Sequence, residues 1–123
     1  MFAKQYADVM AQVSGQRVLI SDRDQIIAAA GNGKKELADH YISKPLEGRL
    51  STRKMVIASE DDKDYILVVD GQKESYKYEI ISPIICGGDV IGGVILLSKE
   101  KEFTELEQKM AVCAAGFLGK QME

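Results

Sequence analysis

The stretch EIISPIICGGDVIGGVILLSKEKEFTELEQKMAVCAAGFLGKQME, residues 79–123, decides how this chain folds. Ile and Val dominate residues 78–86 and 90–97, and β-branched side chains suit a pleated strand. Gly87-Gly88-Asp89 between them can adopt the positive φ angles of a hairpin turn, so the two strands are predicted to pair antiparallel. Residues 90–97 are apolar on both faces, which predicts a central strand of a sheet covered on both sides.

A helix is predicted to follow this hairpin and to cover the sheet. Thr104 and Glu107 have the spacing of a capping box. Gly92 and Gly93 would weaken a strand unless something needs the room, so they predict a bulge or a closely packed helix or ligand. Apolar residues then recur at helical spacing, namely Phe103, Leu106, Met110, Cys113 and Phe117.

The remaining chain predicts further short elements. Residues 2–14 form a helix that ends at Gly15, and its apolar face contains Phe2, Tyr6, Val9, Met10 and Val13. Two strands, 17–21 and 25–30, are joined by Asp22-Arg23-Asp24, whose side chains favour a tight turn. Ser43 caps a helix with Pro45 in its first turn. The other expected elements are a short helix within residues 34–42, an edge strand at 55–59, and a strand or inserted turn at 65–69.

Composition predicts one globular domain over residues 1–123. Hydrophobic residues make up 46% and charged residues 28%, and the formal net charge is −3. Because basic and acidic residues are interspersed, the chain is not expected to bind nucleic acid itself. The chain has neither the pattern of a signal peptide nor an apolar run of about 18 residues, the length that predicts a membrane span. We therefore expect a cytoplasmic protein in which Cys86 and Cys113 are reduced and buried.

No set of residues indicates catalysis, a metal site or a cofactor. His40 is the single histidine and is interpreted as a surface residue. Asp22-Arg23-Asp24 lacks the other ligands of a calcium loop. The expected site is instead an apolar pocket between one sheet face and residues 34–75, with a few polar groups. We predict that these groups come from Arg49, Arg53, Tyr65, Tyr76 and Tyr78.

The expected fold is therefore α+β, with a central antiparallel sheet of about five strands. The terminal helices lie on one face, and short helices and loops lie on the other. The apolar stripes of the terminal helices predict a homodimer or tetramer, although both stripes can instead simply cover the sheet. The expected interface residues are Tyr6, Met10, Val13, Met110 and Phe117.

Residues 79–123 resemble the end of a GAF domain through Pro83-Ile84, the Gly87-Gly88 turn, Ile91-Gly92, and the helix residues Phe103, Glu107 and Ala114. Most of the chain also resembles the C-terminal GAF-like domain of the stage V sporulation protein T family of AbrB-type transcriptional regulators. That likeness lies in FAKQYAD (2–8), VLISDRD (18–24), Lys34-Lys35, AAGFL (114–118) and QME (121–123).

The resemblance implies a sporulation regulator that oligomerises through its terminal helices and senses an unidentified small molecule. DNA contact is implied only through a separate N-terminal domain. Two alternatives stay open. One is a GAF-type redox enzyme similar to free methionine sulfoxide reductase, with Cys86 as nucleophile. The other is a purely structural oligomerisation module.

Overall fold

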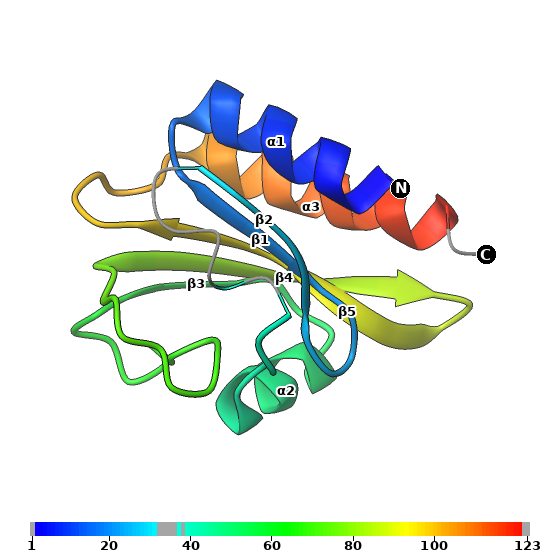
Figure 1. Ribbon diagram of the computed structural model, residues 1–123, viewed down its shortest axis with the longest axis horizontal. Coiled ribbons are helices and arrows are strands. Elements are labelled where there is room, and N and C mark those ends of the chain that lie inside the picture. The colour runs from blue at the N-terminus through cyan, green and yellow to red at the C-terminus, as the bar shows by residue number, and fades with distance from the viewer. Residues whose placement is uncertain (1, 32–36, 38, 122–123) are drawn as a thin grey trace.

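The computed structural model describes residues 2–31, 37 and 39–121. Its elements are α1 (Phe2–Ser14), β1 (Arg17–Ser21), β2 (Ile26–Ala30), α2 (Lys44–Ser51), β3 (Val56–Ser59), β4 (Tyr78–Cys86), β5 (Asp89–Ser98) and α3 (Glu105–Gln121). Helices α1 and α3 lie side by side on one face of the sheet, and α2 lies on the other (Figure 1). This confirms the expected α+β architecture.

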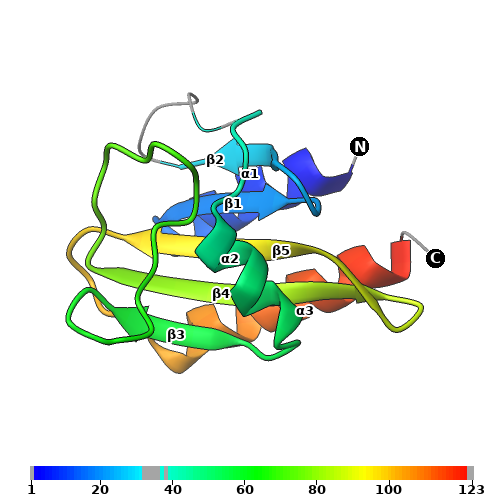
Figure 2. The ribbon, with the colours of Figure 1, turned by 90° about the horizontal axis from the view of Figure 1, so that it is seen from below.

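The sheet has five strands in the order β2-β1-β5-β4-β3, and every neighbouring pair is antiparallel. Strand β5 is central, as its two apolar faces predict. The β4–β5 hairpin is confirmed, and Gly87 and Gly88 in its turn have φ angles of 57° and 87°. Figure 2 shows α2 crossing the sheet over β5 and β4, with the β3–β4 connection beside it.

Gly92 and Gly93 inside β5 leave room for neighbouring groups, and both a bulge and a closely packed helix are found there, as predicted. A Cβ atom on Gly92 would lie 1.9 Å from the Ser21 carbonyl oxygen, and one on Gly93 would lie 2.6 Å from Leu50 Cδ2 of α2. The β4–β5 register also shifts between Ile84 and Ile85, close to Gly92. Helix α2 can pack closely on the sheet because Gly93 of β5 has no side chain beneath Leu50.

Local turn and capping chemistry is confirmed at three places. Ser43 Oγ accepts a hydrogen bond from Leu46 N–H at 3.0 Å at the start of α2. Asp22 Oδ1 accepts from the N–H groups of Asp24 and Gln25, both at 2.8 Å, and so fixes the β1–β2 turn. At the start of α3, Glu107 Oε1 accepts a hydrogen bond from Thr104 N–H at 2.6 Å, as in the predicted capping box.

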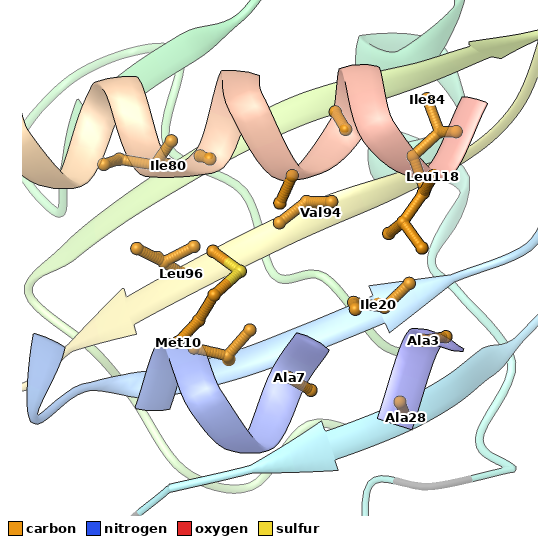
Figure 3. Close-up of a cluster of buried hydrophobic side chains, with 14 of the residues drawn as sticks. Ala3, Ala7, Met10, Ile20, Ala28, Ile80, Ile84, Val94, Leu96 and Leu118 are labelled. Atoms are coloured by element: carbon orange, nitrogen blue, oxygen red, sulfur yellow. The ribbon is translucent and has the colours of Figure 1, made fainter. Parts of the chain in front are cut away.

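The helix faces that cover the sheet consist mainly of small residues, and the large apolar residues point away from it. Against the sheet lie Ala3, Ala7, Met10 and Ala11 of α1, with Ala111, Ala114, Ala115 and Leu118 of α3 (Figure 3). Phe2, Val9, Val13 and Leu106 are 52–65% exposed, and Phe117 is 36% exposed. The apolar stripes therefore do not merely cover the sheet. Met10 and Phe103 do lie in the core, at 5% and 6% exposure, and Tyr6 and Met110 pack against it while partly buried, so Met10 is wrongly predicted as an interface residue.

Three further expectations need correction. Residues 65–69 do not form a strand, and Val69 makes only an isolated bridge with Ile42. Residues 34–36 and 38 of the helix expected within 34–42 lie outside the described part, and the described residues 39–42 are not helical. Cys113 is exposed on α3 rather than buried, while Cys86 at the end of β4 is half-buried.

We predict opposite effects for alanine at two glycines of α3. A Cβ on Gly119 would lie 2.2 Å from the Ile85 carbonyl oxygen, whereas one on Gly116 meets nothing within 4 Å. Gly119→Ala should destabilise the fold by about 1–3 kcal/mol because α3 must move off β4. Gly116→Ala, the matched control, should stabilise it by up to ~1 kcal/mol through helix propensity. Urea unfolding measures both, and equal effects would contradict this packing.

Candidate functional site

A buried carboxylate lies on the sheet face that α2 covers. Glu79 of β4 is 1% exposed, and its register neighbours on β5 and β3 are Leu97 and Ala58. Its Oε2 accepts a hydrogen bond from Ile66 N–H at 2.9 Å. Ile66 belongs to the segment 60–77 that connects β3 to β4, which we call the strap. Glu79 therefore ties the strap to β4 of the sheet.

Burial dominates the electrostatics of Glu79. It raises the pKa of the Glu79 carboxyl from 4.5 to about 7, because removal from water disfavours the charged form. The Ile66 N–H and the Arg49 guanidinium act in the opposite direction but do not cancel the effect of burial. The Glu79 carboxyl thus changes its charge near neutral pH, and its hydrogen bond to Ile66 N–H of the strap then depends on pH.

Two more contacts fasten the strap. The Tyr65 hydroxyl donates a hydrogen bond to the Tyr76 carbonyl at 2.6 Å across the strap. Arg49 of α2 donates from Nη2 to the Asp64 carbonyl at 3.1 Å and lies 3.4 Å from Asp64 Oδ1. Burial raises the pKa of the Tyr65 hydroxyl, more than its hydrogen bond to Tyr76 lowers it. The Arg49 Nε is buried without a hydrogen-bond partner among the described residues.

The predicted site residues divide into two groups. Arg49, Tyr65 and Tyr76 come together around the strap, on the sheet face that was expected to bind a ligand. Tyr78 instead packs with the core beneath α1 and α3, because successive strand residues point to opposite faces. Arg53 lies exposed just after α2 with a φ of 66°.

Sequence reasoning missed Glu79, although a signal for it was present. Glu79 and Ile81 are two residues apart, so they share a face of a strand whose other residues are mostly buried. A carboxylate at such an inward position indicates a buried, perturbed acid.

The expected apolar cavity beneath α2 is filled by side chains. Leu46 and Leu50 of α2 pack there with Ile81, Ile95 and Leu97 of the sheet. Two open depressions lie at the ends of this layer. One of about 580 Å³ lies beside α2 and the β1–β2 turn, and its polar lining includes Arg23, Asp24, Glu47 and Asp89. The other, about 430 Å³, lies at the opposite end, beside Arg17, Tyr76 and Lys99.

The described residues contain no group of three or more His, Cys, Asp or Glu side chains arranged to hold a metal ion. His40 is exposed, and its carbonyl accepts a backbone hydrogen bond from Ile26. Within the described ranges, no helix is long and apolar enough to cross a membrane.

The architecture is that of a GAF domain. It superposes on the GAF domain of a phosphoenolpyruvate-protein phosphotransferase from Coxiella burnetii with a TM-score of 0.78 and 14% identity, covering 98% of this chain and 79% of that one. The cofactor-binding GAF domain of the nutrient sensor CodY from Clostridium difficile gives 0.69 and 14%, covering 98% and 83%. A type II free methionine-R-sulfoxide reductase from Thermoplasma acidophilum gives 0.69 and 15%, covering 97% and 91%.

Sequence comparison gives the family. The family model described as "Stage V sporulation protein T C-terminal, transcription factor" matches residues 1–123. Stage V sporulation protein T of Bacillus subtilis (strain 168) is 40% identical over 122 residues, which are 99% of this chain and 67% of the relative. The chain belongs to this family of transcription-factor domains, and its resemblance to the family is thereby confirmed.

We predict that Glu79→Gln changes how stability depends on pH. Because folding raises the pKa of Glu79 from 4.5 to about 7, the wild-type protein loses stability as pH rises between these values. The variant keeps an acceptor for Ile66 N–H and carries no charge. The free energy of unfolding of Glu79→Gln should exceed that of the wild type by little near pH 4 and by on the order of 3 kcal/mol above pH 7.

Urea unfolding across pH 4 to 8 measures this difference. Glu102→Gln, at an exposed carboxylate, is the matched control and should run parallel to the wild type. A constant difference between Glu79→Gln and the wild type at every pH would contradict the buried, titrating carboxylate.

Proposed function

We propose that this chain is a non-catalytic regulatory domain that associates with copies of itself through α1 and α3 and responds to a small molecule on the opposite sheet face. The observation that carries the first part is a strip of large apolar side chains on the outer side of the two helices. DNA contact then belongs to a separate domain, and the expected location is the cytoplasm.

Aromatic side chains of the strip join the two helices. Phe2 and Tyr6 of α1 meet Phe117 of α3, with ring centroids 6.2 Å and 4.9 Å apart. Contiguous exposed apolar surface of this kind is typical of protein interfaces, and aromatic residues are enriched at their centres. We propose that a second copy covers the strip, as a homodimer or within a tetramer. Its members are Phe2, Tyr6, Val9, Val13, Leu106, Met110 and Phe117.

The sensing part is supported by how the strap is held. Polar bonds from Glu79, Arg49 and Tyr65 fasten it, and one of them depends on a carboxyl that titrates near neutral pH. The buried Arg49 Nε is a donor that a ligand can satisfy. A small molecule that contacts Arg49, Tyr65 or Tyr76 would therefore change the strap. The CodY domain, whose fold this chain shares, is described as the cofactor-binding part of a nutrient sensor.

A redox enzyme is the competing function, because a methionine sulfoxide reductase shares the fold at 15% identity. Cys86 lies half-buried at the end of β4, and Cys113 lies exposed on α3. Neither cysteine is in a disulfide. Because the matching family model describes a transcription-factor domain, we predict no turnover of free methionine-R-sulfoxide with a dithiol reductant. Turnover that Cys86→Ser abolishes, and that Cys113→Ser leaves intact, would overturn the non-catalytic assignment.

The self-association proposal predicts the effect of charges on the strip. Sedimentation at micromolar concentration should show a dimer or tetramer for the wild type and a monomer for Val9→Glu/Phe117→Glu, because two buried glutamates per copy must lose their hydration. Tyr41→Glu is the control, since Tyr41 is 67% exposed and precedes α2. A monomeric wild type, or equal dissociation by the control, would contradict the interface.

A further inference from the structure

The depression of about 430 Å³ is lined by residues of the α1–β1 turn and of the segment after β5, at the end of the sheet where Arg17 pairs with Leu97. Figure 1 shows this turn and this segment at the same end of the sheet. Two buried polar side chains form its floor, because Arg17 is 3% exposed and Tyr76 is 2% exposed. The rim carries Lys99, Glu100 and Lys101, all of them exposed. Three cations thus face one carboxylate in the lining.

A carboxylate of the strap already pairs with one of these cations and feels the charge of a second. Glu74 Oε2 lies 2.9 Å from Lys99 Nζ, and Lys99 and Arg17 both lower the pKa of the Glu74 carboxyl. The Lys99 ammonium also lies 5.7 Å from the centre of the Tyr76 ring, which holds it over the depression. Glu74 therefore lies beside the two cations that a bound anion would use.

We propose that this depression is a binding site for a small anion with a carboxylate or phosphate group, and that the anion competes with Glu74 for Lys99 and Arg17. The inference rests on the proposed sensing function, because it names the class of ligand. Lys99 and Glu74 are 58% and 33% exposed, and ion pairs that water reaches to this extent contribute little to stability. Displacement of Glu74 thus costs little, whereas a guanidinium and an ammonium together make charge-assisted bonds to the anion.

Release of Glu74 reaches the rest of the strap through Gln72. Gln72 Nε2 donates to the Glu74 carbonyl at 2.9 Å, and Gln72 Oε1 accepts from Val68 N–H at 3.0 Å. Val68 lies two residues after Ile66, whose N–H binds Glu79. The proposed anion therefore acts at Glu74 on the same strap that Glu79 binds at Ile66.

Calorimetric titration of the whole chain with inorganic phosphate and, separately, with succinate tests this site. We expect saturable binding of at least one probe, and the pair shows whether the site takes phosphate or carboxylate. Lys99→Met should weaken binding at least about tenfold, because a charged hydrogen bond is lost. Glu74→Gln should strengthen it by up to about fivefold, because the internal competitor is gone.

Lys109→Met is the control, since Lys109 is an exposed lysine of α3 that pairs with Glu105, and it should bind as the wild type does. Failure of both probes, or binding that Lys99→Met leaves unchanged, would overturn the anion site. A wild type that binds neither probe but is stabilised by another metabolite would overturn this inference alone and leave the sensing proposal standing. Sedimentation of the same samples reports separately on self-association.

Discussion

The close approach of α1 and α3 to the sheet is the constraint on which the rest of the structure depends. Alanines at intervals of four along α1, Ala3, Ala7 and Ala11, let that helix lie directly on the strands, and Gly119 lets α3 touch the backbone of β4. The larger apolar side chains must then point outward, since a helix that buries small residues on one side presents its other faces to solvent. The exposed apolar strip follows from this packing and gives the helix layer its proposed second role.

The sheet face that α2 covers is held by polar contacts as well as by apolar packing. Leu46 and Leu50 anchor α2 over β5, and the strap beside them is held both by the buried side chains of Val68, Val69 and Tyr76 and by hydrogen bonds to Glu79, Ser43 and Arg49. The polar contacts are the part of this attachment for which a polar ligand can compete. In the proposed account, the partner chain covers the helix face and the small molecule acts on the polar contacts of the strap.

Turns, helix caps and strands could be predicted from the sequence, whereas the direction in which helix and strand side chains point could be predicted only in part. Turn glycines, the Ser43 cap and the apolar β5 depend on neighbours in the chain, and all were predicted correctly. Helical periodicity gives weight to large residues and so missed the alanines that are buried. Tyr78 was assigned to the wrong face because its strand register was not considered, and the pKa of Glu79 depends on the strap, whose path no local pattern encodes.

The central claim is that a second copy of the chain covers the outer side of α1 and α3, and Cys113 offers a direct test because it is exposed on α3. A spin label on Cys113, with Cys86→Ser to keep labelling unique, reports the distance between copies by pulsed dipolar spectroscopy. The account predicts an intermolecular coupling that disappears on dilution with unlabelled chain. A folded, labelled protein without any such coupling at micromolar concentration would contradict it.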